Sequence, residues 1–172
     1  MGFVVLATPL VESDISETTD TSGEIIDKLE LKLKEVPLDY PDKSVREITV
    51  AGVLEYIPGK DRGAFMDELY RVLTDDGKIT IMVPYWNSWR AYFDARVEWP
   101  PFCEQSFLCY NKEWRNINTK DLILNCDFDF TYGYAWDTEA QNRNDESRAF
   151  WTKHYTNCVD ALQLTLTKRA KG

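Results

Sequence analysis

The chain has 172 residues, of which 44% are hydrophobic and 28% are charged, and its formal net charge at pH 7 is −9. This length suits a single folded domain over residues 1–172 and is too short for two ordinary ones. The 29 acidic residues outnumber the 20 basic ones, so the chain repels phosphate backbones and we expect no nucleic-acid partner.

The cysteines and the N-terminal segment indicate a cytoplasmic protein that makes no contact with a membrane. The four cysteines form no CxxC pair, the close spacing on which a zinc site depends, and free thiols in a reducing cytosol are preferred over disulfides. The apolar residues 3–11 are too short to cross a bilayer and have no basic residue before them. A buried first strand accounts for this segment better than a targeting signal does.

The N-terminal third of the chain predicts a strand, a loop and one ambiguous segment. Residues 3–7 are a run of Val and Leu ending before Pro9, which predicts a strand. Residues 12–24 are polar and acidic without apolar periodicity, which is typical of an exposed loop. Residues 25–36 fit a strand with one wet face, because leucines alternate with charged residues, and they also fit a helical stripe.

Residues 36–85 predict one complete βαβ unit. An apolar run over residues 45–51 is typical of a strand covered on both faces. After Pro58 and Gly59, apolar residues recur at three- and four-residue steps, which predicts a helix over residues 60–73. Gly77 is expected to form its left-handed cap, and residues 78–83 a second strand. A helical crossover implies that the two strands are parallel neighbours in the centre of an α/β sheet.

These segments resemble the second half of a class I S-adenosylmethionine-dependent methyltransferase of the type-11 kind. The matching segments, in order, are PLDYPDKSVRE, VLEYI, ELYRVLTDDG and KITIMVPY. The resemblance implies an α/β fold with a Rossmann-like methyltransferase sheet, mostly parallel with an antiparallel C-terminal strand. It also favours the strand interpretation of residues 25–36, because the loop that follows them matches the family's approach to its fourth strand.

The place of the family's cofactor loop differs in this chain. In that family the first strand runs into a G-x-G-x-G turn, whose glycines let the backbone approach S-adenosylmethionine closely. Here residues 3–7 run into Thr8, Pro9 and Leu10, and no glycine occurs between Gly2 and Gly23. The N-terminal half is therefore shortened relative to the family, and we predict that S-adenosylmethionine binds weakly or not at all.

The resemblance also indicates where the remaining cofactor contacts would lie. Either Asp14 or Glu12 stands where the family keeps an acidic residue for the ribose hydroxyls, although a solvated acidic loop is the plainer interpretation. Gly52, Val53 and Leu54 follow the strand over residues 45–51 and would form one wall of a ligand site.

Residues 84–118 form an aromatic-rich insertion that holds four of the six tryptophans. It resembles the insertion of bacteriophage-type methyltransferases, which carry a pattern close to S-x-R-A-x-x-D-P-T-H before K-E-W-R. Here residues 95–97 replace the P-T-H portion, so its histidine is missing. Because α/β proteins place ligand contacts past the carboxyl ends of strands, the insertion predicts a substrate wall. Its residues are Tyr85, Trp86, Arg90 and Asp94. The alternative is a packed lid with Arg90 and Asp94 paired at its edge.

The last third of the chain predicts two strands with a helix between them. Aromatic residues alternate over 128–136, and leucines alternate over 162–166. Residues 144–155 predict a helix with its aromatic residues and His154 on the inner side. His154 is the only histidine, and it is either a packed helix residue or a catalytic base.

Two classes of function follow from the sequence. The first is an enzyme that transfers a methyl group from S-adenosylmethionine to an unknown acceptor, by positioning and desolvation. The second is a catalytically inactive protein of the same fold that acts as an interaction or structural module. The partner is accordingly a small molecule or another protein.

Overall fold

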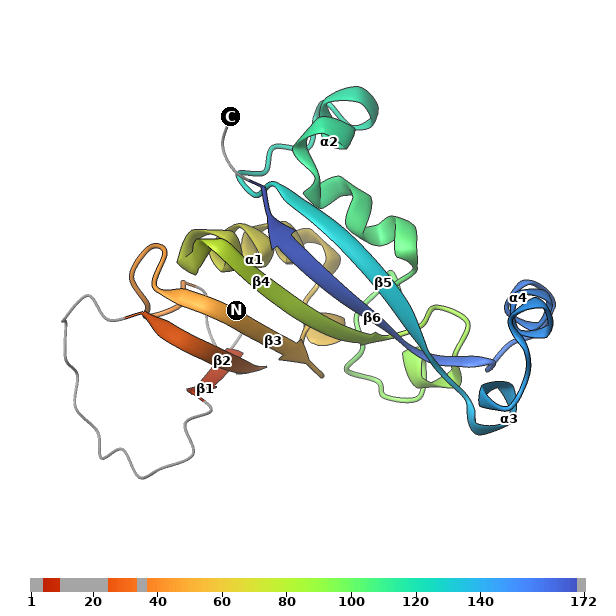
Figure 1. Cartoon of the computed structure of the whole chain (residues 1–172). Coiled ribbons are helices and arrows are strands. Elements are labelled where there is room, and N and C mark those ends of the chain that lie inside the picture. Colours follow the sequence, from red (N-terminus) through yellow and green to blue (C-terminus); the bar gives the residue numbers. More distant parts are fainter. Residues whose placement is uncertain (1–4, 10–24, 34–36, 170–172) are drawn as a thin grey trace.

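A computed structural model describes residues 5–9, 25–33 and 37–169 of the chain. They form a six-stranded sheet in the order β1-β2-β3-β4-β6-β5 (Figure 1). The strands are β1 (Val5–Pro9), β2 (Ile26–Leu33), β3 (Val45–Ala51), β4 (Leu73–Pro84), β5 (Phe128–Trp136) and β6 (Val159–Lys168). The helices are α1 (Gly59–Val72), α2 (Lys112–Asn118), α3 (Thr138–Gln141) and α4 (Asp145–His154), with short 3-10 turns η1 (Leu54–Tyr56), η2 (Trp89–Ala91) and η3 (Glu104–Tyr110). None of the helices in these described ranges is long and apolar enough to span a membrane.

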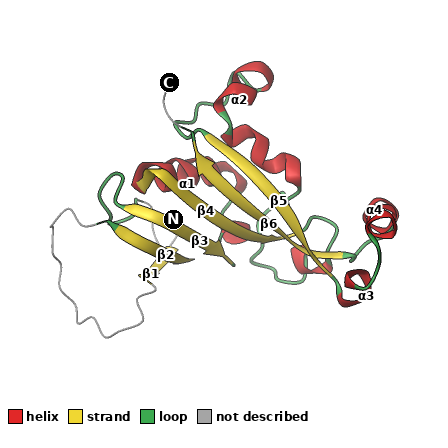
Figure 2. Cartoon of the chain, viewed as in Figure 1, coloured by secondary structure: helices red, strands yellow, loops and turns green. Residues whose placement is uncertain are grey.

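The strand directions confirm the α/β sheet that the resemblance implied. β2, β3 and β4 are parallel neighbours, and β6 is antiparallel to both β4 and β5. β5 therefore runs in the same direction as β4. β1 lies at the opposite edge, antiparallel to β2. The helices and strands of this mixed architecture are distinguished in Figure 2.

The central βαβ unit is confirmed as predicted, with two local corrections. β3 and β4 are parallel, with Ile48 beside Ile79, and α1 connects them. However, α1 ends at Val72 and β4 begins directly at Leu73, so Gly77 lies inside the strand and forms no left-handed cap. A Cβ atom at Gly77 would lie 2.6 Å from the Leu73 side chain and 2.9 Å from the Arg46 carbonyl oxygen. Glycine is needed here for close packing.

The strand interpretation of residues 25–36 is confirmed by β2, and it changes the role of β1. In an open α/β sheet the first strand of the fold lies beside the fourth, at the switch point. The second parallel neighbour of β3, on the side away from β4, is β2, whereas β1 pairs antiparallel outside β2, with Pro9 beside Leu29. The carboxyl end of β1 therefore faces away from the edge where β2, β3 and β4 end. Placing Thr8 and Pro9 in the cofactor turn was wrong, and Leu10, Glu12 and Asp14 lie outside the described residues.

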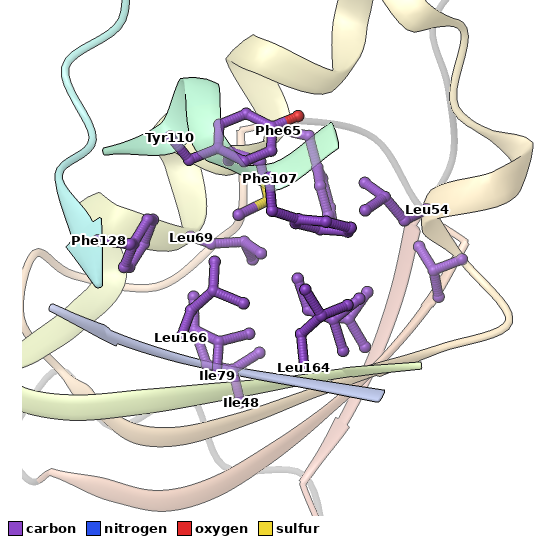
Figure 3. Packing of buried hydrophobic residues seen from close by; sticks show 14 of the residues in the cluster. Ile48, Leu54, Phe65, Leu69, Ile79, Phe107, Tyr110, Phe128, Leu164 and Leu166 are labelled. Atoms are coloured by element: carbon purple, nitrogen blue, oxygen red, sulfur yellow. The ribbon is translucent and has the colours of Figure 1, made fainter. Parts of the chain in front are cut away.

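The hydrophobic core lies on one face of the sheet. α1 and η3 cover this face, and Figure 3 shows their side chains meeting those of the strands. The fully buried members include Ile48, Leu54, Phe65, Leu69, Ile79, Phe107, Phe128, Leu164 and Leu166. On the opposite face Thr49, Ala51, Met82, Gln163 and Thr167 are exposed, and no helix of the described residues covers them (Figure 1). The prediction that β3 is covered on both faces is wrong.

The C-terminal elements are confirmed, but the inner side predicted for the helix is not. β5 and β6 pair antiparallel along their length, with Phe130 beside Leu166. α4 has no buried residue, and Phe150 is 53% exposed. His154 is also exposed, and its ring centroid lies 4.4 Å from that of Phe150. His154 is thus a surface residue rather than a packed one.

Candidate functional site

The carboxyl ends of β4 and β5 meet at one edge of the sheet, together with the beginning of β6. Pro84 is beside Ala161, and Trp136 is beside Val159. Two long connections leave from this edge. Residues 85–127 lead to β5 and carry η3, and residues 137–158 lead to β6 and carry α4. Side chains from both connections can therefore converge beside the ends of the strands.

These connections enclose a cleft of about 510 Å³, which we call the Tyr85–Glu104 cleft. Its lining comes from the residue after β4, the first residue of η3, the last residues of β5 and one side of α4. The lining residues are Tyr85, Glu104, Tyr134, Trp136, Asp145, Arg148, Ala149, Thr152 and Lys153. The cleft thus combines two carboxylates, three aromatic rings and two basic side chains.

Glu104 is the polar centre of this cleft. Its Oε1 atom accepts a hydrogen bond from the Tyr85 hydroxyl at 3.0 Å and a second, short one from the Tyr134 hydroxyl. Burial raises the pKa of Tyr85 to about 12, and burial together with Glu104 raises the pKa of Tyr134 further. Both hydroxyls therefore stay protonated at neutral pH and hold the carboxylate in place.

The aromatic rings of the cleft contact one another edge to face. The Tyr85 and Tyr134 centroids are 5.5 Å apart at 70°, and those of Tyr134 and Trp136 are 5.3 Å apart at 67°. Such contacts stabilise a fixed ring arrangement by about 0.5–1.5 kcal/mol each beyond their burial. The rings form a rigid wall beside Glu104.

Arg148 and Lys153 line the opposite wall, which α4 supplies. The Arg148 guanidinium donates to the carbonyl oxygens of Gln141 at 2.6 Å and Ala140 at 3.3 Å, next to the end of α3. It also lies 5.6 Å from the Trp136 ring centroid. Lys153, one turn and a half further along α4, is exposed and forms no ion pair with the described residues. The α4 wall also carries the Asp145 carboxylate, so its net charge is +1, whereas Glu104 gives the other wall a negative charge.

Of the predicted substrate wall, the cleft contains only Tyr85. Trp86 is 47% exposed and is not among the lining residues. Arg90 Nε lies 3.2 Å from Asp160 Oδ1, and Asp94 Oδ2 lies 2.6 Å from Arg96 Nη2. The hydrogen bonds from Arg96 lower the pKa of Asp94 to about 2. The predicted pairing of Arg90 with Asp94 is therefore wrong, and both residues are engaged elsewhere.

The predicted cofactor wall is mostly inaccessible. Gly52 has a φ of +67° with open space around its α-carbon. Val53 and Leu54 are 0% exposed and pack into the core, so their side chains cannot contact a ligand. Within the described residues, the end of β3 is thus followed by one exposed backbone turn at Gly52 and then by two buried side chains. Val53 and Leu54 therefore present no side chain to the ribose or methionyl groups of S-adenosylmethionine.

Glu55, which follows this turn, was not singled out from the sequence. It is 6% exposed, and burial raises the pKa of its carboxyl group. Its Oε2 atom has no hydrogen-bond partner among the described residues. The segment VLEYI marked the end of the strand but gave no sign that its carboxylate is buried.

The sequence likewise did not single out Glu104, Tyr134 and Trp136. The alternation in residues 128–136 places Tyr134 and Trp136 on one face of β5, which was a usable signal. Glu104 had none, because it lies in an irregular insertion and reaches the tyrosines only through the fold.

Comparisons with known proteins give structural likeness only. No protein-family model matches the chain, and no curated protein matches it. A SAM-dependent methyltransferase from Archaeoglobus fulgidus superposes with a TM-score of 0.49 at 12% identity, covering 75% of this chain and 62% of that one. The YcgJ protein from Bacillus subtilis gives 0.40 at 13% identity, covering 78% and 68%. Phosphoethanolamine N-methyltransferase 2 from Haemonchus contortus, in complex with phosphomonomethylethanolamine and S-adenosylhomocysteine, gives 0.43 at 11% identity, covering 77% and 35%. The chain thus spans less than two thirds of the first of these proteins and about a third of the last.

Proposed function

We propose that this chain is a methyltransferase-like protein that holds a small molecule, its methyl acceptor, in the Tyr85–Glu104 cleft. The observation that carries this proposal is the convergence of Tyr85, Glu104 and Tyr134 at the carboxyl ends of β4 and β5. Open α/β sheets bind their ligands at this edge, in a pocket with a few fixed polar groups. The volume of about 510 Å³ suits a small organic molecule.

The residues of the cleft have distinct roles in this proposal. Tyr85 and Tyr134 fix the Glu104 carboxylate through Oε1, which leaves Oε2 to accept a hydrogen bond or a proton from the acceptor. Arg148 and Lys153 attract an anionic group at the other wall.

Four free cysteines are consistent with a reducing, cytoplasmic location.

We further propose that S-adenosylmethionine binds to this chain alone weakly or not at all. Support comes from the inaccessible residues after Gly52 and from the sequence between Gly23 and Gly52, which contains no glycine for a close backbone approach. Losing two or three hydrogen bonds, each worth about 0.5–1.5 kcal/mol, weakens binding by about one to three orders of magnitude.

Calorimetric titration with S-adenosylmethionine tests this prediction, with S-adenosylhomocysteine titrated in parallel. We expect no saturable heat, or a dissociation constant of about 100 μM or weaker. A dissociation constant in the low micromolar range for either compound would overturn the prediction. It would also show that a cofactor site forms without a glycine turn.

An interaction module without methyl transfer is the second candidate, and the insertion 84–118 favours it. Trp89, Phe93 and Trp99 of this segment are 50%, 65% and 74% exposed. Exposed aromatic residues are enriched at protein–protein interfaces. Incubation with methyl-labelled S-adenosylmethionine and a mixture of small amines, alcohols and acids separates the two candidates, because label in a small product supports only the enzyme.

A further inference from the structure

The Tyr85–Glu104 cleft has charges whose signs differ between its two walls. Glu104 lies beside Tyr134 and Trp136 on the side of the sheet, whereas Arg148 and Lys153 lie on α4. Asp145 also lines the cleft, but its side chain is 99% exposed and its Oδ1 lies 3.2 Å from Arg148 Nη1. The charges of the four groups sum to zero. Such a cleft favours a ligand that is itself neutral overall and carries one charge of each sign.

The carboxylate of Glu104 has capacity for a cationic group. Oε1 is occupied by the two tyrosine hydroxyls, and no hydrogen bond from the described residues reaches Oε2. Glu104 is half-buried, so its negative charge is only partly screened by water. An ammonium group beside Oε2 would complete the set of partners that this carboxylate can take.

The aromatic wall also favours a cation. Tyr134 and Trp136 are half-buried and line the cleft, so part of each ring is accessible to a ligand. Alkylated ammonium groups bind to Tyr and Trp faces within about 6 Å of the ring centroid. Trp136 already has the Arg148 guanidinium 5.6 Å from its centroid. The remaining contacts would come chiefly from Tyr134.

The anionic end of the ligand would lie against Lys153. The Arg148 guanidinium is held by the carbonyl oxygens of Ala140 and Gln141, which fixes its charge in place. Lys153 is exposed and has no acidic partner among the described residues, so its ammonium group is free to turn toward a bound anion.

We propose that the Tyr85–Glu104 cleft binds a small zwitterionic amine, with its alkylammonium group between Glu104 and Tyr134 and its acidic group at Lys153 and Arg148. This inference rests on the proposal that the cleft takes a small molecule, and it adds the chemical class of that molecule. It requires no bound cofactor.

Glycine betaine is a suitable probe, because two close analogues each lack one of its charges. In tert-butylacetate a carbon replaces the ammonium nitrogen, and in choline a hydroxymethyl group replaces the carboxylate. Each compound is titrated by calorimetry and by following the NMR resonance of the Trp136 indole N–H, which is assigned by its loss in Trp136→Phe. Glycine betaine should bind at least about tenfold more tightly than either analogue.

Two variants and one control test which residues of the cleft bind the two charged groups of the ligand. Glu104→Gln keeps an oxygen that can accept from both tyrosines but removes the charge, and should weaken betaine and choline at least about tenfold. Lys153→Gln should weaken betaine and leave choline unchanged. Glu98→Gln makes the same change as Glu104→Gln at an exposed position of the insertion outside the lining, and should change neither.

The possible failures point to different conclusions. Equal binding of glycine betaine and tert-butylacetate at the Trp136 resonance would overturn the zwitterion but keep a ligand-binding cleft. Full retention of betaine affinity in Glu104→Gln would overturn the assigned position of the ammonium group. No shift of the Trp136 resonance with any probe, or with a mixture of neutral fragments, would overturn both this inference and the proposed function.

Discussion

Leu69→Asp is expected to leave the chain without a cooperative folded state. Leu69 is 0% exposed in the last turn of α1, where it meets the side chains of the central strands (Figure 3). An Asp there must either bury a charge without a partner or bind a proton, and it also leaves apolar space unfilled. Burying an unpaired charge costs several kcal/mol, comparable to the total stability of about 5–15 kcal/mol for a domain. Thermal unfolding followed by circular dichroism measures the effect.

Ala64→Asp is the matched control for this substitution. Ala64 lies on the exposed side of the same helix, so the same new charge meets water and its effect should stay within about 0.5 kcal/mol. If Leu69→Asp melted with the same midpoint as Ala64→Asp, this face of α1 would not be part of the core.

Arg62→Ala is expected to lower the free energy of unfolding by about 3 kcal/mol, because Arg62 connects α1 to the aromatic insertion. Its guanidinium donates to the carbonyl oxygens of Ile57 at 2.9 Å, Pro100 at 2.7 Å and Glu98 at 2.9 Å. It also lies 4.2 Å from the Phe102 ring centroid. Arg62 is 5% exposed, and hydrogen bonds to charged groups contribute about 1.5–3 kcal/mol each. The expected loss is smaller than the sum of three such bonds, because water can bind to the carbonyl oxygens in the variant.

Arg96→Ala provides the comparison, since it removes the same charge from the insertion at an open position. The Arg96 side chain is 78% exposed, although it pairs with Asp94 and lies 5.3 Å from the Tyr56 ring centroid. Exposed ion pairs contribute about 1 kcal/mol or less. Urea unfolding of both variants should therefore show a clearly larger loss for Arg62→Ala. Equal losses would mean that the buried contacts of Arg62 do not hold the insertion.

The βαβ unit could be predicted from the sequence because its signals are local. The helical stripe over residues 60–73 and the apolar strands on either side each fit one period over a short window. Gly77 was misplaced for the same reason. A glycine after two aspartates has the local signature of a cap. Here, however, glycine is required because a larger residue would clash with the Leu73 side chain and with the Arg46 carbonyl oxygen on a neighbouring strand.

The position of β1 could not be predicted, because strand pairing is not a local property. Residues 3–7 and 25–36 both fit strands, and nothing in either segment states which of them lies beside β3. The resemblance placed residues 3–7 beside β3, whereas the strand pairing places β2, from residues 25–36, beside β3. The inference about Thr8 and Pro9 failed with that assignment.

The residues of the cleft could not be predicted from the sequence for a related reason. Its polar centre joins β4, η3 and β5 through Tyr85, Glu104 and Tyr134, which are separated by 19 and 30 positions. The prediction gathered residues that follow β4 directly, because nearness along the chain was the only available guide. Of these, Tyr85 alone points into the cleft.

The helices of the described residues cover one face of the sheet only, and this has a consequence for the heat capacity of unfolding. The side chains of Thr49, Met82, Gln163 and Thr167 already contact water in the folded state, so unfolding hydrates little additional surface there. Newly hydrated apolar surface is the source of the positive heat-capacity change, which is about 12–15 cal/mol/K per residue in ordinary domains. A sheet with one hydrated face contributes less than this, and a smaller heat-capacity change flattens the curve of unfolding free energy against temperature. The folded state consequently depends less steeply on temperature, in the cold as well as in the heat, than a sheet covered by helices on both sides.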